Sequence, residues 1–240
     1  MERQLHGDIA CPPPSPPTVP PIPTRHLYEA KPARYFANAR HDMVACLPTG
    51  PCSAILEVGC GAGGTARAVR AAGKAGRYVG IELCPAAAAE AREAVDRLLI
   101  GDVETLDVEQ AGNGFDALIL SEVLEHLVDP WRTVRRLAAL LRPGGLVLAS
   151  SPNIAHWSIV ASMLKGRFDY AASGVMDSTH LRWFTPASYR RLFEQGGFSV
   201  THIAPVREPG WRGNLVNRLS GNRLQHLFMT QMMLTGLRRG

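Results

Sequence analysis

The chain has 240 residues, a net charge of +5 and an apolar share of 46%, which suits one large folded domain. No run approaches the roughly 18 consecutive apolar residues of a membrane-spanning helix, so we expect no membrane span. The N-terminus has no apolar stretch typical of a secretory signal, and the five cysteines are scattered without a Cys-x-x-Cys pair. These features predict a cytoplasmic protein with reduced thiols. The modest positive charge makes a nucleic-acid partner unlikely on composition alone.

The first part of the chain is rich in proline, with eight prolines between Cys11 and Pro23. Proline at this density excludes a helix or a central strand, so residues 1–24 are predicted to form a disordered or polyproline II tail. Residues 25–240 are expected to form a single domain. Within it, residues 31–47 carry apolar side chains at helical spacing and predict a helix. That helix would cover the mouth of a ligand site or simply pack against the sheet edge.

A glycine-rich turn follows a short apolar segment in the sequence Ile55-Leu-Glu-Val-Gly-Cys-Gly-Ala-Gly-Gly-Thr65. Residues 55–58 suit a buried strand, and the alanine-rich residues 65–72 suit a helix. A strand, a glycine turn and a helix N-terminus form the nucleotide-cofactor corner of a doubly wound α/β sheet. The glycines fit two spacings and do not by themselves identify the cofactor.

Strands and helices then alternate along the chain, which predicts a mainly parallel sheet with right-handed crossovers. The second strand, 77–82, ends in Glu82, about twenty positions past the turn, where a carboxylate can accept two hydrogen bonds from a ribose diol. An exposed glutamate at a strand end is the structural alternative. The later predicted elements are the helix 85–95, the strands 98–100 and 115–120, the helix 131–141, the strand 146–150, the helix 186–195 and the strand 198–204.

The C-terminal segment from Pro205 contains six arginines and a single acidic residue, Glu208. Residues 228–237 fit either a strand or a helix continuing from Leu215. We favour a strand that pairs antiparallel with 198–204 and completes a seven-stranded sheet. The arginines fit a solvated face or, alternatively, an RNA-binding surface.

The order of these signals resembles the class I S-adenosylmethionine-dependent methyltransferases, which have a Rossmann-like fold. The resemblance rests on Glu57-Val-Gly-Cys-Gly, Glu82, Gly101-Asp102, Phe115-Asp-Ala-Leu and the Pro143-Gly-Gly turn. The segments Ser121-Glu-Val-Leu-Glu-His126 and Leu141-Arg-Pro-Gly-Gly145 are similar to the ubiquinone- and menaquinone-type branch. A nicotinamide enzyme is the alternative for the glycine corner, but the sequence shows no recognisable hydride-transfer constellation.

The resemblance implies S-adenosylmethionine as the cofactor and assigns its methionine end to the first and fourth strands. Glu57 and the backbone at Gly59 and Gly61 would hold this end. Ser121 and Glu122 would face the methionine portion and the methyl group. Carboxylates suit this position because the cofactor carries an ammonium and a sulfonium.

The same resemblance places the adenosine end at the second and third strands. Glu82 would hold the ribose hydroxyls, and Leu83 would lie beside the adenine. Asp102 would accept a hydrogen bond from the adenine amine, with Val103 against the ring.

The acceptor side is expected in residues 152–185, which we predict to be an insertion that forms the acceptor pocket. The segments 151–156 and 180–185 are similar to those of bacterial relatives that modify sugars and cell-surface polysaccharides. The Asn/Asp-Pro-Pro-Tyr pattern of amino-methylating enzymes is missing from the sequence, which favours an oxygen or carbon acceptor. The predicted function is methyl transfer to a small-molecule or sugar acceptor, at a hydroxyl oxygen. An RNA methyltransferase using the basic C-terminal segment and a non-catalytic cofactor-binding module are the alternatives.

A hydroxyl acceptor has a proton to lose, and histidine is the usual base because its pKa lies near neutral pH. His126, in the loop after the fourth strand, and His180, in the predicted insertion, are the candidate catalytic residues. Each has a structural alternative, bracing a loop. His156 is a weaker third candidate. We expect no metal site, because Glu122 already has a cofactor role beside Glu125 and His126.

Overall fold

The computed structural model describes residues 31, 36–50 and 53–240, so the predicted tail 1–24 lies outside the described residues. Its centre is a seven-stranded sheet in the order β3-β2-β1-β4-β5-β7-β6. The strands are β1 (Ala54–Val58), β2 (Arg77–Glu82), β3 (Arg97–Ile100), β4 (Phe115–Ser121), β5 (Leu141–Pro152), β6 (Phe198–Pro205) and β7 (Gln231–Arg238).

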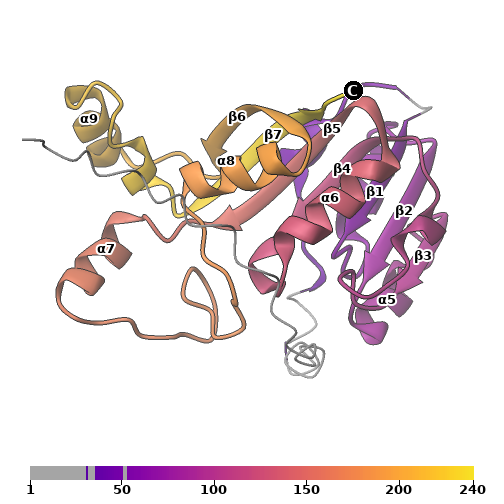
Figure 1. Cartoon of the computed structure of the whole chain (residues 1–240), viewed down its shortest axis with the longest axis horizontal. Helices are drawn as coiled ribbons and strands as arrows, with labels where there is room; N and C mark the ends of the chain where they lie inside the picture. Colours follow the sequence, from indigo (N-terminus) through magenta and orange to yellow (C-terminus); the bar gives the residue numbers. More distant parts are fainter. Residues whose placement is uncertain (1–30, 32–35, 51–52) are drawn as a thin grey trace, which may run out of the picture.

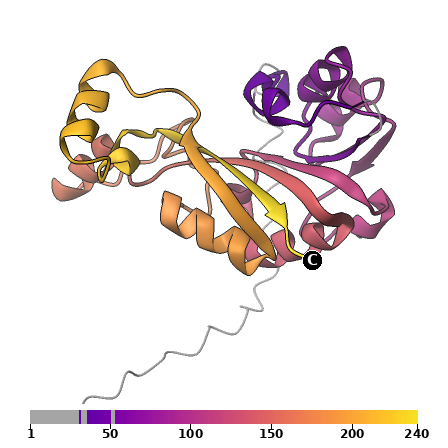
Figure 2. The same cartoon turned by 90° about the horizontal axis from the view of Figure 1, so that it is seen from above.

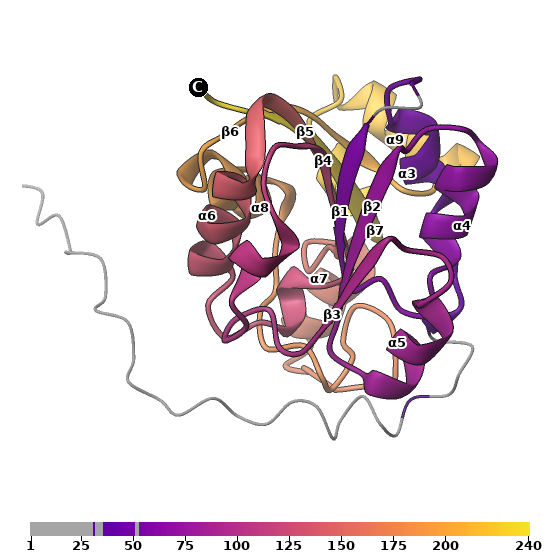
Figure 3. The ribbon, with the colours of Figure 1, turned by 90° about the vertical axis from the view of Figure 1, so that its right-hand side faces the viewer.

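Helices cover both faces of this sheet, as Figure 3 shows. One face carries α3 (His41–Cys46), α4 (Gly64–Ala71) and α5 (Pro85–Ala91), and the other carries α6 (Pro130–Leu140) and α8 (Pro186–Gln195). The alternation of side chains along β1 divides the core between the two faces. Ile55 belongs to the cluster that contains Met43 of α3, whereas Leu56 belongs to the cluster that contains Leu137 and Phe193 of α6 and α8. The doubly wound prediction is therefore confirmed.

The direction of the strands defines where a ligand can bind. Strands β1 to β5 are parallel to one another, and the chain reverses its course across the sheet between β3 and β4. Adjacent strands β1 and β4 therefore flank the switch point at which open α/β sheets bind ligands. β7 lies antiparallel between β5 and β6, which confirms the predicted antiparallel strand.

Several predicted boundaries differ from the structure. The helix expected over 31–47 is present as His41–Cys46, residues 32–35 lie outside the described part, and residues 37–40 are not helical. The Phe36 carbonyl instead accepts a hydrogen bond from the Ala62 amide at 2.9 Å, so this segment packs on the glycine turn. The helix predicted over 85–95 ends at Ala91. β5 begins at Leu141 rather than at residue 146, with a register shift against β4.

Two helices lie at one end of the molecule, at the left of Figures 1 and 2. They are α7 (Trp157–Leu164) and α9 (Trp211–Leu219). Short 3-10 helices complete the described elements: η1 (Val108–Ala111), η2 (Leu124–His126) and η3 (Gln225–Phe228). Within the described ranges, no helix has the length and apolar character required to cross a membrane.

Candidate active site

The carboxyl ends of β1, β2 and β4 border a cavity of about 650 Å³, a size typical of small-ligand sites. Eleven of the twelve residues singled out from the sequence line this cavity, and the exception is His156. The eleven are Glu57, Gly59, Gly61, Glu82, Leu83, Asp102, Val103, Ser121, Glu122, His126 and His180. The fold thus brings together side chains from four strand ends and from the loop before α8.

Glu82 is held at the end of β2 by two backbone amides. Its Oε2 accepts from Gly61 N–H at 2.8 Å and its Oε1 accepts from Cys84 N–H at 2.9 Å. Burial raises the pKa of Glu82, and the two amides oppose that rise. The carboxylate is therefore oriented before a ligand arrives, with lone pairs left on both oxygens.

Gly61 brings its amide to Glu82 through a left-handed backbone conformation, with φ of +53°. A Cβ atom at this position would lie 2.5 Å from the Phe36 carbonyl oxygen. Glycine is required here for two reasons, the positive φ and the close approach of segment 36–40.

Glu57 is a buried acid on β1 whose Oε2 accepts a hydrogen bond from the Tyr78 hydroxyl at 2.7 Å. Burial raises the pKa of Glu57 to about 7, and the Tyr78 hydrogen bond opposes that rise. Near neutral pH this carboxyl is divided between its neutral and charged forms. A cation in the cavity would favour the charged form.

The loop after β3 contributes Asp102 and Val103 to the lining of the cavity. Asp102 accepts from the Glu104 amide at 2.9 Å, which stabilises a turn at this position. Val103 is buried, and both residues line the cavity with Leu83.

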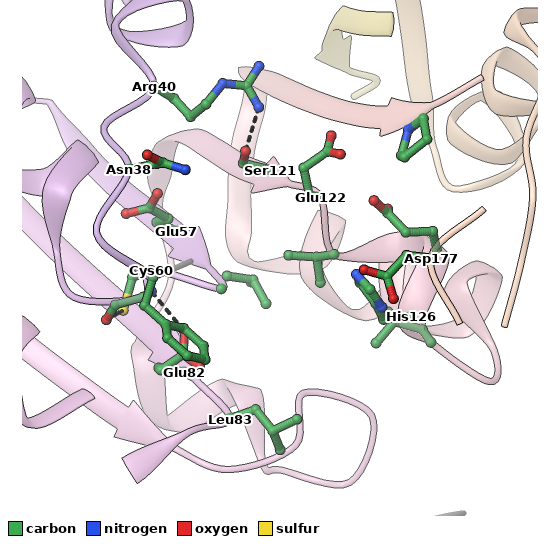
Figure 4. A pocket seen from close by; sticks show the side chains of 18 of the residues that line it. Asn38, Arg40, Glu57, Cys60, Glu82, Leu83, Ser121, Glu122, His126 and Asp177 are labelled. Carbon is green, nitrogen blue, oxygen red and sulfur yellow. Dashed lines mark hydrogen bonds between the residues drawn. The ribbon is translucent and has the colours of Figure 1, made fainter. Parts of the chain in front are cut away.

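Arg40 is a cavity residue that the sequence interpretation missed. Its Nη1 donates to Ser121 Oγ at 2.5 Å and to Ser150 Oγ at 2.6 Å, and Asp42 accepts from its Nε at 2.9 Å. Burial opposes the charge, but Asp42 outweighs it and raises the pKa of Arg40. Figure 4 shows the guanidinium directed at Ser121, with Asn38 and Glu57 nearby.

Glu122 adopts a strained backbone conformation at the end of β4, with φ of +55°. Non-glycine residues rarely occupy this region, and such strain concentrates at functional sites. Ser150 accepts from the Glu122 amide through its carbonyl at 3.2 Å and donates through its hydroxyl to Glu122 Oε1 at 2.8 Å. The carboxylate is thereby held at the cavity, opposite Glu57 (Figure 4).

His126 and His180 lie together on the far side of the cavity from Glu57, with ring centroids 4.8 Å apart. Nδ1 of His126 lies 3.2 Å from the Thr179 carbonyl and Nδ1 of His180 lies 3.1 Å from the Val175 carbonyl. A carbonyl partner places the proton on Nδ1 and the lone pair on Nε2. Burial lowers the pKa of His126 to about 4 and also lowers the pKa of His180. Both rings are therefore neutral at pH 7.

Glu125 lies beside these histidines and is almost fully buried. Its Oε2 accepts from Ser151 Oγ at 3.3 Å, while Oε1 has no hydrogen-bond partner among the described residues. Burial raises the pKa of Glu125 well above its usual range. Ligand atoms of Glu125, His126 and His180 lie within 4.8 Å of one another, a donor set that can hold a metal ion. From the sequence, Glu122 was considered together with Glu125 and His126. In the structure, His180 takes the place of Glu122 in this group.

The predicted insertion 152–185 contributes its first residue, Pro152, and one loop to the cavity. Ser173, Gly174, Val175, Asp177 and His180 line it. Asp177 accepts from Lys31 Nζ at 2.7 Å and from the Thr179 amide at 2.9 Å. Burial would raise the pKa of Asp177, but Lys31 and Thr179 outweigh it and hold the pKa below its usual range. The loop that carries His180 is thus tied to the N-terminal side of the described chain.

His156 lies outside the cavity lining. It is the N-cap of α7, where its ring accepts from the Ser158 amide. Its pKa is lowered by burial, but its position gives it a structural role at the start of that helix.

The methyltransferase domain family matches residues 25–203 of the chain. Among curated relatives, the ubiquinone biosynthesis O-methyltransferase of Xanthomonas campestris pv. campestris (strain B100) is 34% identical over 129 residues, 51% of this chain and 53% of that protein. The corresponding protein of Xanthomonas axonopodis pv. citri is 28% identical over 200 residues, 79% of this chain and 78% of that protein. The chain spans about half the length of the first of these relatives.

Solved structures share the same architecture. An S-adenosylmethionine-dependent methyltransferase from Archaeoglobus fulgidus aligns with a TM-score of 0.61 at 15% identity, covering 89% of this chain and 99% of that one. One from Mesorhizobium loti aligns with a TM-score of 0.58 at 17% identity, covering 84% and 98%. At this identity the likeness concerns the fold.

The chain belongs to the methyltransferase domain family. Fold and family together confirm the sequence-based prediction of a class I S-adenosylmethionine-dependent methyltransferase. The relatives named ubiquinone biosynthesis O-methyltransferase are similar to this chain at 28–34% identity. S-adenosylmethionine is the cofactor of this class.

Proposed function

We propose that the protein transfers the methyl group of S-adenosylmethionine to a hydroxyl oxygen of a small-molecule acceptor. One observation carries this proposal: the oriented Glu82 carboxylate and two neutral histidines line the same cavity. The relatives named ubiquinone biosynthesis O-methyltransferase support an oxygen acceptor. A saccharide hydroxyl would present the same chemistry to the site.

The residues at the β1 and β4 ends fit the methionine part of the cofactor. Glu57 and Glu122 would face its ammonium and sulfonium, since the buried Glu57 carboxyl gains its charge most readily beside a cation. Arg40, already charged, would receive its carboxylate. Ser121 would position this end beside Arg40. Bound here, S-adenosylmethionine supplies an electrophilic methyl group.

The residues at the β2 and β3 ends fit the adenosine part. Glu82 would accept from the ribose hydroxyls, because both of its oxygens are already oriented by backbone amides. Asp102 would accept from the adenine amine, with Leu83 and Val103 against the ring. Gly59 and Gly61 would allow the ligand to approach the backbone.

We assign the base to His180 in preference to His126. A base is most effective when its pKa lies near the operating pH, and the pKa of His126, about 4, is far below it. His180 Nε2 would take the proton of the acceptor hydroxyl, whose oxygen would replace the cofactor sulfur on the transferred methyl group. Residues 152–185, through the loop 171–180, would orient the acceptor and exclude water.

Calorimetry with S-adenosylmethionine and with NAD tests the cofactor assignment on wild type and Glu82→Ala. We expect micromolar-range binding of the first by wild type, its loss in Glu82→Ala, and no binding of NAD. Tight NAD binding would contradict the proposal.

Incorporation of a labelled methyl group into a panel of phenolic and sugar hydroxyl acceptors tests the transfer. His180→Ala should lower the rate about 10²–10⁴-fold with an unchanged cofactor affinity. His126→Ala is the matched control and should have the smaller effect on rate. Cofactor binding without transfer to any acceptor would favour the non-catalytic module.

The RNA alternative meets a structural constraint. The basic segment 205–240 includes β7, and the Arg238 guanidinium donates to the Leu141 carbonyl. Deleting the segment would therefore disrupt the sheet. Reversing the charge of Arg218 and Arg223 is the cleaner test, and RNA binding lost in that variant but not in Arg92→Glu would support this alternative.

A further inference from the structure

Helix α7 is almost wholly apolar, with the sequence Trp-Ser-Ile-Val-Ala-Ser-Met-Leu. All of its residues are described, and none of them is buried. Leu164 is 84% exposed and Trp157 is 54% exposed. A helix of this composition in water is expected to bury its apolar side against another surface.

Helix α9 and the segment after α7 expose further large apolar side chains at the same end of the molecule (Figures 1 and 2). In α9, Leu215 and Leu219 are 50% and 80% exposed and lie one helical turn apart. We call the combined surface the apolar end; it consists of Trp157, Met163, Leu164, Phe168, Tyr170, Leu215, Val216 and Leu219. The other exposed large apolar residues of the described chain are Trp211 at the start of α9, and Ile100, Trp131 and Leu237 on β3, α6 and β7.

Basic residues flank the apolar end. The segment 205–228 contains four arginines and one glutamate, and Arg218 and Arg223 within it are exposed. Lys165 follows α7 and is also exposed. Arg167 is paired with Asp169 at 2.8 Å and contributes less net charge. Among the residues that the structure describes, Lys165, Arg218 and Arg223 form no ion pair. Exposed apolar side chains flanked by such cations are complementary to a lipid surface that carries anionic headgroups.

We propose that the apolar end docks the protein on an anionic membrane surface, with α7 and α9 lying in the interface. The tryptophan and tyrosine of the apolar end suit the boundary between lipid and water. A helix of eight residues is far too short to span a bilayer, so the association is peripheral.

The position of the cavity agrees with this docking. The chain leaves the cavity wall at Pro152 before α7 and at Arg207 before α9, and it returns at Thr230 after η3. Docking would therefore hold this side of the cavity close to the lipid. The docking itself does not depend on the proposed methyl transfer.

Flotation of the full chain with vesicles tests the proposal, using phosphatidylcholine alone and phosphatidylcholine mixed with phosphatidylglycerol. We expect flotation with the mixed vesicles, weakened by salt, and little with phosphatidylcholine alone. The double variant Leu164→Glu/Leu219→Glu should lose flotation. Trp157→Ala should weaken it, whereas the matched control Trp131→Ala should not.

Charge-reversal variants measure what the basic residues contribute to vesicle binding, separately from the apolar side chains. Arg218→Glu/Arg223→Glu should lower vesicle affinity roughly tenfold or more, and Arg92→Glu/Arg135→Glu, which changes exposed arginines away from the apolar end, should leave it unchanged. Retained cofactor binding shows that each variant is folded. The proposal fails if wild type does not float with the mixed vesicles, or if both charge-reversal variants float equally. It also fails if sedimentation shows a dimer that Leu164→Glu dissociates, because a second copy would then cover the surface.

Discussion

Glu57 is the residue through which pH should act on the cofactor site. Burial places the pKa of Glu57 at about 7 in the free protein, and a bound ammonium would lower it. The complex then carries fewer protons than the free protein, so binding weakens as pH falls below 7. We expect up to about a tenfold loss of affinity from pH 7 to pH 6.

Calorimetry at several pH values measures this loss, with Glu57→Gln as the control. The variant should bind more weakly at pH 8 and show a flatter pH profile, because an amide does not titrate in this range. A Glu57→Gln profile as steep as that of wild type would assign the titration to another group.

Substitution of Gly61 tests the glycine turn, because both the positive φ and the close approach of the Phe36 carbonyl require a glycine at this position. In Gly61→Ala the Cβ would lie 2.5 Å from the Phe36 carbonyl oxygen, whereas at Gly73, with φ of +64°, nothing lies within 4 Å. Gly73→Ala should cost about 1–2 kcal/mol from the left-handed conformation alone, lowering Tm by about 2–4 °C per kcal/mol.

Gly61→Ala should lower Tm further and also weaken cofactor binding, because the displaced amide no longer orients Glu82. Thermal unfolding and calorimetry on both variants measure the two effects. Equal Tm losses with intact binding would show that the contact with segment 36–40 relaxes without cost.

The success and failure of sequence reasoning at single residues have a physical origin. Glu57 and Glu82 could be predicted because each stands in or at the end of an apolar strand beside the glycine turn, a local pattern. Arg40 could not, because its hydrogen bonds reach Ser121 and Ser150 across 81 and 110 positions. No local periodicity distinguishes it from a solvated arginine on a helix.

At the scale of elements, tertiary contacts override local preference in the segment before β1. Apolar side chains at helical spacing predicted a helix through residue 47, yet residues 37–40 are not helical. The Ala62 amide of the glycine turn donates a hydrogen bond to the Phe36 carbonyl, which holds this segment against the turn. The strands and helices from β1 to α6 were predictable because their patterns are local. The shape of the loop 171–180 depends on Asp177 and Lys31, which are far apart in sequence.

Asp177→Asn tests what that loop contributes. The substitution removes the charge that accepts from Lys31 Nζ and weakens the turn at Thr179, so His180 should be positioned less well. We expect a several-fold higher KM for the acceptor and a lower kcat, with cofactor affinity unchanged within about twofold. Such effects are common when a positioning contact is lost.

Steady-state kinetics and calorimetry separate these effects, and Asp169→Asn is the matched control. Asp169 also pairs with a cation, Arg167, but the pair is exposed and should contribute little. Equal effects of the two substitutions would argue against a special role for the loop.

At the scale of the whole molecule, the order of the strands determines which parts of the chain can be removed. β7 comes last in sequence yet lies between β5 and β6. Its residues pair with β5 from Gln231 to Leu237 and with β6 from Met232 to Arg238. The sequence predicted the antiparallel pairing with β6, but pairing with β5 is a long-range contact that no local pattern reports.

We therefore expect opposite results from the two terminal deletions. Removing 205–240 eliminates β7 and exposes the facing edges of β5 and β6, so the product should lose cooperative unfolding and cofactor binding. Residues 1–24 were predicted from the sequence to form a tail outside the folded domain. Removing them should therefore shift the unfolding transition by no more than about 2 °C, which corresponds to less than about 1 kcal/mol. Circular dichroism melts and calorimetry on both deletions provide the measurement. A large loss of stability on removing 1–24 would show that this segment belongs to the folded domain.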